Sequence, residues 1–272
     1  MRGLLPATVH VMALTATASS RTRDCIIHTL CMESPKVLSV SPHKKNILYT
    51  VKDKTTMEEV VGSLSMQLKA PRTKFPRLII FCKQYDECSR MYWLFKYFLK
   101  EEFTDPPQAP NLAKYRLVDM YTKCTEGSVK DRSRCVRSFC SPSGVMRIVI
   151  ATVAFGMCLD CPDVRQIILW GAPSDPESFI QQTGRGGKDG LLTLALLFHA
   201  KSDHRWASKE MIDFCEKGDT CRRKQIFSSF DNFSNLQFPC TLCRCCDVCM
   251  QKCSCESCSV GKCYIVEAFS CL

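Results

Sequence analysis

The chain has 272 residues, of which 46% are hydrophobic and 24% charged, with a formal net charge of +10. This composition supports a sizeable buried core and does not fit a disordered chain. No stretch approaches 18 uncharged apolar residues, and the first residues lack a secretory signal, which argues against membrane and secreted classes. The basic charge favours polyanionic partners such as nucleic acids, although many soluble proteins are basic without one.

Up to about residue 200, apolar runs that predict strands alternate with segments of helical spacing. The predicted strands are Val9–Leu14, Arg77–Cys82, Tyr115–Tyr121, Met146–Ala151, Val164–Trp170 and Leu192–Phe198. The predicted helices run from a cap at Ser19 or Ser20 to Leu30, over Tyr85–Lys100, over Ser128–Cys140 and around Glu177–Thr183. Apolar strands separated by helices predict an α/β fold with a parallel sheet covered on both faces. Functional loops are then expected after Leu14, Ala151 and Trp170, at the carboxyl ends of strands.

The pattern changes after about residue 201. Lys201–Cys215 and Thr220–Phe230 predict a small helical hairpin with Gly218 in its turn, and the sequence beyond Pro239 is rich in cysteine. Nine of the 21 cysteines lie in the first 214 residues and twelve between Cys215 and Cys271. A secreted disulfide framework is usually short and rich in cysteine throughout, so this distribution favours an intracellular protein with a metal site near its end.

Three segments contain residues suited to phosphate chemistry. Val11–Ser19 reads V-M-A-L-T-A-T-A-S, Ile150–Met157 reads I-A-T-V-A-F-G-M, and Gln181–Gly190 reads Q-Q-T-G-R-G-G-K-D-G. A hydroxyl just past a buried strand, as at Thr152, can bind a DNA phosphate together with loop N–H groups. The planar guanidinium of Arg185 matches the charge that builds on a γ-phosphate. Taken singly, the first segment also fits an ordinary capped turn and the third a glycine-rich basic turn.

In this order and spacing, the three segments resemble motifs III, V and VI of RecQ-type helicases of superfamily 2. Leu78–Cys82 is similar to motif IV, and Ser41–Tyr49 to the entry of the second motor domain. The resemblance implies a RecA-like sheet and a partial ATP-dependent 3′–5′ DNA helicase, nuclear in a eukaryote. Its partners would be single-stranded or forked DNA, with ATP and Mg²⁺ bound only in an intact two-domain enzyme.

The resemblance also implies roles for individual residues. Arg185 and Lys188 would be catalytic, and together with Asp160 they would bind the nucleotide. The residues expected to contact nucleic acid are Thr15, Thr17, Thr152, Arg222 and Arg223. For Arg222 and Arg223, a solvated helix face is an equally good interpretation.

The sequence departs from the family in ways that bear on activity. It contains neither G-x-x-x-x-G-K-[ST] nor D-E-x-H, the segments that handle phosphates and magnesium, and it starts at motif III. Lys188 replaces the second arginine of motif VI, and an arginine finger contributes roughly 10³–10⁵ in rate. Gln182 replaces an acid, Cys158 a glycine and Cys161 a lysine. A non-enzymatic zinc protein that binds nucleic acid without ATP turnover is therefore the competing hypothesis.

The cysteine-rich segment is similar to the RecQ zinc site, C-R-R followed about twenty residues later by C-x-x-C-D-x-C. The matching cysteines predict a structural zinc ion held by Cys221, Cys243, Cys246 and Cys249. Cys240, three residues before Cys243, competes with it. The cysteines beyond Cys249 have no counterpart in the family, and either a second metal or an irregular tail accounts for them.

The expected organisation has four parts. Residues 1–40 correspond to the end of a first RecA-like motor domain, which contains motif III. Residues 41–200 form the second RecA-like domain, 201–252 a zinc-binding module, and 253–272 a cysteine-rich irregular tail. The oligomeric state and the preferred DNA structure stay open.

Overall fold

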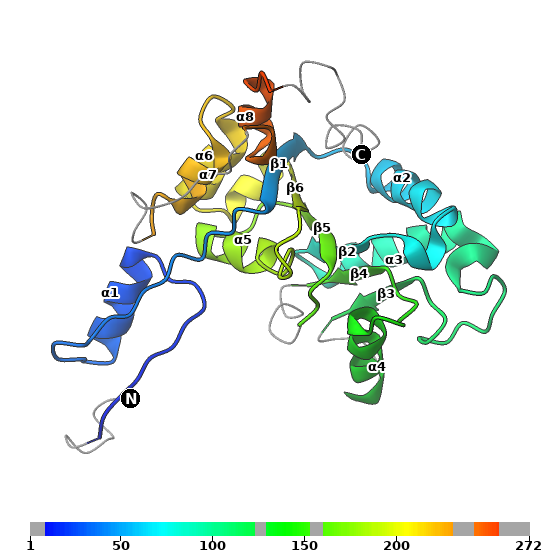
Figure 1. The fold of residues 1–272 in the computed structure, drawn as a ribbon, viewed down its shortest axis with the longest axis horizontal. Coiled ribbons are helices and arrows are strands. Elements are labelled where there is room, and N and C mark those ends of the chain that lie inside the picture. The colour runs from blue at the N-terminus through cyan, green and yellow to red at the C-terminus, as the bar shows by residue number, and fades with distance from the viewer. Residues whose placement is uncertain (1–8, 123–128, 153–159, 231–241, 256–272) are drawn as a thin grey trace.

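The structure is a computed structural model that describes residues 9–122, 129–152, 160–230 and 242–255. Within these residues six parallel strands form one sheet in the order β1-β6-β5-β2-β4-β3 (Figure 1). The strands are β1 (Ile47–Asp53), β2 (Arg77–Cys82), β3 (Val118–Tyr121), β4 (Ile148–Ala151), β5 (Val164–Trp170) and β6 (Thr193–His199). The predicted α/β class with a parallel sheet is therefore confirmed.

Helices connect and cover these strands. The α-helices are α1 (Ser20–Thr29), α2 (Met57–Lys69), α3 (Tyr85–Leu99), α4 (Val129–Cys140), α5 (Pro176–Thr183), α6 (Lys209–Glu216), α7 (Arg222–Phe227) and α8 (Asp247–Gln251). Short 3₁₀ helices are η2 (Arg72–Lys74), η3 (Lys100–Phe103), η5 (Lys201–Arg205) and η7 (Leu242–Arg244). Figure 1 shows α2 and α3 on one side of the sheet, away from α5, α6 and α7.

The central strand β2 is buried along its whole length, and its side chains alternate between the two faces of the sheet. Leu78 and Ile80 belong to the core beneath α2 and α3, whereas Ile79 and Phe81 belong to the core on the opposite face. This alternation follows from the two-residue period of a strand. Continuous apolar strands buried on both faces are what a parallel sheet requires.

The core beneath α5 continues into the cysteine-rich segment without a break. Tyr49 of β1, Phe179 of α5, Phe214 of α6, Phe227 of α7 and Val248 of α8 all belong to one cluster of buried residues. Tyr49 and Phe179 have ring centroids 5.6 Å apart, and those of Phe179 and Phe214 are 4.9 Å apart. The helices predicted to form a separate module thus share their core with the sheet.

Two elements escaped prediction and one predicted strand is wrong. The strand β1 and the helix α2 were not recognised as elements, although Thr56 caps α2 by accepting from Glu59 N at 3.2 Å. Residues Val9–Leu14 have no strand assignment, and Leu14 is exposed. A strand needs a neighbour to satisfy its N–H and C=O groups, and no described segment pairs with this one.

Candidate functional site

The turn after α5 is held in place by backbone contacts to the start of β1. Lys44 Nζ donates to Gly184 O at 2.8 Å and to Gly186 O at 3.1 Å. The Asn46 side chain donates to Gly187 O at 2.8 Å. Gly187 N donates to Val164 O at 3.2 Å, which connects the same turn to β5. The segment that resembles motif VI is therefore a fixed loop at the amino ends of the central strands.

Two glycines are required for this close packing. A Cβ atom at Gly186 would lie 2.4 Å from Thr193 Cγ2. Gly187 has φ +59°, in the left-handed region, and a Cβ there would lie 2.3 Å from Asn46 Nδ2. Any larger residue would push the turn away from β1 and β6 and would displace Arg185.

Positive charge is concentrated on this turn. Lys44 Nζ contacts the backbone on both sides of Arg185, and burial, then the charges of Lys188 and Arg185, lowers the pKa of Lys44. Lys188 Nζ lies 2.8 Å from Asp160 Oδ1, and this contact lowers the pKa of Asp160. Asp189 pairs with Arg165 through both carboxylate oxygens. The predicted nucleotide residues Asp160, Arg185 and Lys188 are thus brought together, and the net charge suits an anion.

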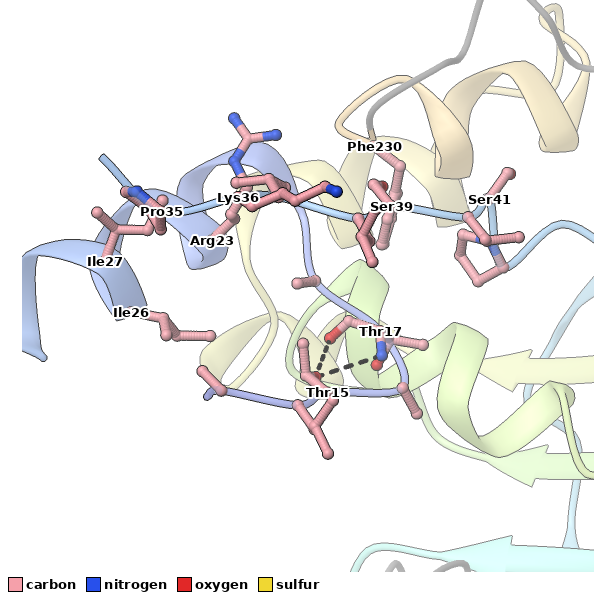
Figure 2. Close-up of a pocket in the computed structure, with 18 of the residues that line it drawn as sticks. Thr15, Thr17, Arg23, Ile26, Ile27, Pro35, Lys36, Ser39, Ser41 and Phe230 are labelled. Carbon is pink, nitrogen blue, oxygen red and sulfur yellow. Dashed lines mark hydrogen bonds between the residues drawn. The ribbon is translucent and has the colours of Figure 1, made fainter. Parts of the chain in front are cut away.

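The predicted Thr-Ala-Thr loop lies beside α5 but is a separate, exposed feature. Thr15 Oγ1 donates to Thr17 O at 3.0 Å, and Ser19 N donates to Glu177 Oε1 of α5 at 2.7 Å. Figure 2 shows Thr15 and Thr17 lining a pocket together with residues of α1, the segment 35–41 and Phe230. The Ser19–Glu177 contact links this loop to the helix that leads into the motif VI turn.

The remaining predicted phosphate ligand, Thr152, follows β4 and is half-buried. The rest of the segment that resembles motif V, 153–159, lies outside the described residues and includes Cys158. Cys161 of the same segment is buried, with its Sγ 3.2 Å from Asp163 Oδ1.

Arg222 and Arg223 are not on the surface, contrary to both interpretations of the sequence. Arg222 is buried and pairs with Asp247 at 3.1 Å, and it donates to Lys217 O at 3.0 Å. Arg223 is fully buried and has polar partners on two segments. Those partners are His43 Nε2 (2.8 Å), Lys44 O (2.7 Å), Lys45 O (3.1 Å), Ile47 O and Cys245 O (3.3 Å). These guanidinium groups cannot reach a DNA phosphate because backbone carbonyls and Asp247 already surround them.

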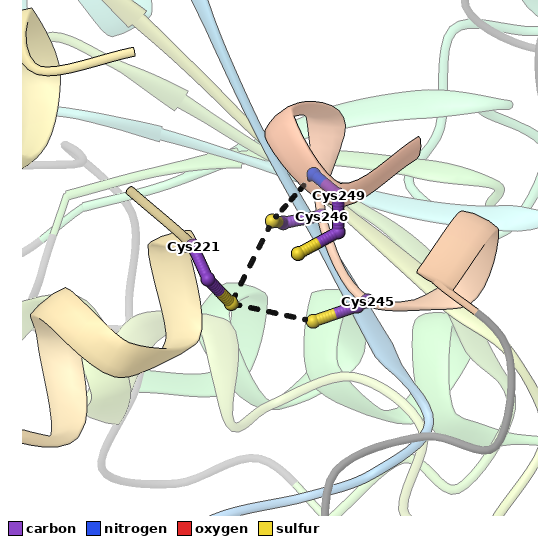
Figure 3. A group of neighbouring side chains, drawn as sticks. All are labelled: Cys221, Cys245, Cys246 and Cys249. Atoms are coloured by element: carbon purple, nitrogen blue, oxygen red, sulfur yellow. Dashed lines mark hydrogen bonds between the residues drawn. The ribbon is translucent and has the colours of Figure 1, made fainter. Parts of the chain in front are cut away.

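Four thiols converge where α7, η7 and α8 meet (Figure 3). The Sγ atoms of Cys221, Cys245, Cys246 and Cys249 all lie within 4.8 Å of one another. Cys221 Sγ is 3.5 Å from Cys245 Sγ and 4.0 Å from Cys246 Sγ. Four thiolates around one zinc ion, each with a Zn–S bond of about 2.3 Å, would be roughly 3.8 Å apart. The arrangement therefore fits a tetrahedral zinc site.

The fourth member of this cluster differs from the sequence prediction. The structure places Cys245 with Cys221, Cys246 and Cys249, whereas Cys243 lies in a second group with Cys253 and Cys255. The reason is local: residues 242–244 form the 3₁₀ helix η7, and Cys243 faces the end of α8 while Cys245 faces α7. Spacing alone does not distinguish two cysteines that are two residues apart. The rival Cys240 lies outside the described residues.

Several residues of the site were missed from the sequence. Lys44 and Asn46 hold the motif VI turn although about 140 residues separate them from it. Asp247 accepts from Arg222 and also from Val51 N at 3.1 Å, which fixes α8 against β1. The D in the C-D-x-C pattern was the available signal for Asp247. Lys44 and Asn46 lie in Ser41–Tyr49, whose resemblance to the domain entry was noticed without assigning either residue a role.

Family models match two adjacent parts of the chain. The model described as "Helicase conserved C-terminal domain" matches residues 59–190, and the model described as "RecQ zinc-binding" matches residues 194–250. The fold agrees, because the chain resembles the yeast protein Dbp5 bound to RNA and ADP BeF3 with a TM-score of 0.57. That similarity has 16% identity and covers 88% of this chain and 52% of the other. The family model and the fold together identify residues 59–190 as a RecA-like helicase C-terminal domain.

Curated relatives identify the particular family. The chain is 28% identical to the ATP-dependent DNA helicase hus2/rqh1 of Schizosaccharomyces pombe, covering 89% of this chain and 18% of that protein. It is 27% identical to the ATP-dependent DNA helicase RecQ of Pasteurella multocida, covering 88% of this chain and 36% of that protein. The chain belongs to the RecQ family of helicases and corresponds to its C-terminal motor and zinc-binding region. It spans less than two fifths of the length of either relative.

In the part of the chain that the structure describes, no helix combines the length and the apolar character needed to cross a bilayer.

Proposed function

We propose that this chain is the second motor half of an ATP-dependent 3′–5′ DNA helicase. The observation that carries the proposal is the fixed turn that contains Arg185 and Lys188, with Lys44 packed against its backbone, at the amino ends of β1, β5 and β6. A preorganised cluster of cations stabilises negative charge that develops on a transferred phosphoryl group. The turn is built before any ligand binds, because its backbone is bonded to Lys44, Asn46 and Val164.

Arg185 would supply the planar guanidinium toward the γ-phosphate, and Lys188 would supply a second positive charge. Lysine presents a point charge instead of a two-pronged donor, so Lys188 contributes less geometric specificity than arginine would. Lys188 is paired with the exposed carboxylate of Asp160 in this structure. Nucleotide binding would replace that carboxylate with phosphate oxygens, with Mg²⁺ and the remaining phosphate contacts supplied by a first motor domain.

DNA contacts would come from loops on this chain. Thr152 follows the buried strand β4, where its hydroxyl and neighbouring N–H groups suit a phosphate. Thr15 and Thr17 lie on a loop that is hydrogen-bonded to α5 through Ser19. A movement of the motif VI turn, which follows α5, would therefore be transmitted to this loop. The net charge of +10 supports a nucleic-acid partner, single-stranded or forked DNA, held mainly through its phosphates.

Cys221, Cys245, Cys246 and Cys249 would bind a structural zinc ion. Their segment is attached to the edge strand β1, because Tyr49 N lies 3.5 Å from Cys245 O and Val51 N donates to Asp247. A zinc ion there would stabilise β1 and, through Lys44 and Asn46, the motif VI turn. Cys221, Cys246 and Cys249 are shared with the set that the sequence predicts, so only the fourth ligand distinguishes the two.

The test is strand displacement by this chain joined to a first RecA-like domain of the same family. A duplex with a 3′ single-stranded tail should be unwound with ATP, and one with a 5′ tail should not. Lys188→Ala should slow ATP turnover, and an unchanged rate would remove the role assigned to Lys188. Equal unwinding of both substrates, or none of either with an intact zinc site, would contradict the proposal.

A second candidate is a zinc protein that binds nucleic acid without hydrolysing ATP. The observation in its favour is Lys188, which replaces an arginine of the family motif. Its Nζ forms an ion pair with Asp160 Oδ1 at 2.8 Å. DNA binding by the joined protein together with no DNA-stimulated ATP turnover would support this candidate over the helicase.

The cell compartment follows from the same proposal. A DNA helicase of a eukaryote would act in the nucleus.

A further inference from the structure

A second group of cysteine thiols lies next to the four that match the family zinc site. The Sγ atoms of Cys243, Cys253 and Cys255 lie within 4.8 Å of one another, and Cys243 Sγ is 3.8 Å from Cys255 Sγ. Two thiolates on one zinc ion, each bonded at about 2.3 Å, would be roughly this far apart. The described part of the segment 221–255 thus divides its seven thiols into groups of four and three.

The chain reaches this arrangement through the end of α8. After α8, Lys252 N donates to Cys249 O and Cys253 N donates to Met250 O, each at 3.1 Å, which turns the backbone back toward η7. Cys243 of η7 is buried, and Cys253 and Cys255 are half-buried. Burial of the thiols around a common point is the arrangement of a metal site and differs from the exposure of Cys25 and Cys31 on and beside α1.

We propose that Cys243, Cys253 and Cys255 bind a second zinc ion beside the first. Thiolates prefer thiophilic d¹⁰ ions, and zinc with three protein ligands keeps a fourth position for water or another donor. Three thiolates around Zn²⁺ leave one net negative charge, and the basic residues Arg244 and Lys252 adjoin two of the ligands in the sequence. The resulting site would fasten the C-terminal end of α8 to η7, where the four-thiol group fastens η7 and α8 to α7.

This assignment also explains why Cys243 and Cys245 lie in different groups. Cys245 Sγ faces Cys221 on α7, while Cys243 Sγ faces Cys255 beyond α8. Cys245 therefore belongs to the four-thiol group and Cys243 to the second group, although the two residues are only two positions apart in the sequence. Cys243→Ser and Cys245→Ser form a matched pair of substitutions that should each remove a different metal.

The experiment counts metal per chain in the full-length protein purified under reducing conditions. Wild type should hold about two zinc ions, and Cys253→Ser/Cys255→Ser about one, with an unchanged far-ultraviolet circular dichroism spectrum. The matched control Cys25→Ser/Cys31→Ser also removes two thiols and should retain about two zinc ions. When cobalt replaces zinc, wild type should hold two thiolate-coordinated cobalt ions per chain and Cys253→Ser/Cys255→Ser should hold one.

The outcomes separate this proposal from the four-thiol site. About one zinc ion in wild type, unchanged by Cys253→Ser/Cys255→Ser, would overturn the second site and leave the first. A disulfide between Cys243 and Cys255 with no bound metal would also overturn it. Cys221→Ser should remove about one zinc ion. If that variant instead loses nothing while the 253/255 variant loses all metal, the four-thiol site fails and the second stands.

Discussion

Two six-residue, mainly apolar segments that both predict strands form different structures. Arg77–Cys82 forms β2, in the middle of the sheet, where the side chain of Leu78 is 0% exposed. Val9–Leu14 precedes a well-capped helix just as β2 does, yet it forms no strand and Leu14 is 83% exposed. An apolar run therefore becomes a strand only where neighbouring strands satisfy its backbone and cover its side chains.

The contrast extends to the segment that follows α1. Leu38 and Val40 are exposed, and they line the same pocket as Leu14. Exposed apolar residues in two nearby segments indicate an interaction surface. A first RecA-like domain, which the helicase proposal already requires, would supply neighbouring strands for both segments.

The sharpest test of this contrast is the same substitution made in both regions. Leu78→Ala should lower the free energy of unfolding by about 2–5 kcal/mol, because it leaves a cavity in the core. Leu14→Ala should change it by no more than about 0.5 kcal/mol, since that side chain is already in solvent. Urea unfolding at neutral pH measures both, and a large effect of Leu14→Ala would show that the N-terminal segment is packed after all.

Arg223 connects the sheet to the cysteine-rich segment, so its removal should also be costly. Arg223→Met keeps an apolar stem over Tyr49 but leaves the carbonyl oxygens of Lys44, Ile47 and Cys245 without their donor. We expect a loss of about 2–3 kcal/mol in unfolding free energy and weaker zinc retention. Lys224→Met, at the exposed neighbouring position, is the control. Equal stability of the two variants would contradict the bridging role of Arg223.

The same bridge should make stability depend on pH. Burial, then the charges of Arg223 and Lys45, lowers the pKa of His43 to about 4 from 6.5. Above pH 6.5 His43 is neutral in both the folded and the unfolded chain, so its titration does not reduce the free energy of unfolding. As pH falls from 6.5 toward 4, only the unfolded chain gains the proton, so stability decreases. Urea midpoints at pH 7 and pH 5 should differ more for wild type than for His43→Gln. Identical pH dependence would exclude His43 as the cause.

The smallest effect on stability is expected from making the N-terminal surface polar. Leu14→Gln/Leu38→Gln should leave the urea midpoint within error, while reducing self-association measured by sedimentation, because exposed apolar patches promote association. If the variant unfolds more easily than wild type, these side chains already contribute to the core of this chain.

The sequence predicted the parallel sheet well because its central strands are long apolar runs. It missed β1, which ends in the charged residues Lys52 and Asp53, and it missed α2, whose cap at Thr56 was not recognised. β1 begins within the predicted domain entry, Ser41–Tyr49, and α2 follows it. Their apolar residues become interpretable only when β1 is seen to pair with β6, about 145 residues further along.

The site was predicted in part for a similar reason. Arg185, Lys188 and Asp160 were found because their motifs are local, whereas Lys44 and Asn46 act through long-range contacts to backbone carbonyls. Arg222 and Arg223 looked like surface cations because arginine usually is exposed. Their burial depends on carbonyl groups from residues 44–47, 214 and 217, which spacing on a helix cannot reveal.

The most direct test of the helicase assignment is DNA-stimulated ATP hydrolysis by this chain joined to a first RecA-like domain. Arg185→Ala should reduce turnover by roughly 10³-fold or more without releasing zinc, as expected for a guanidinium that stabilises the γ-phosphate. Arg90→Ala, a change to an exposed arginine on α3, should leave turnover unchanged. Turnover that survives Arg185→Ala, or that never responds to DNA, would contradict a motor role for this chain.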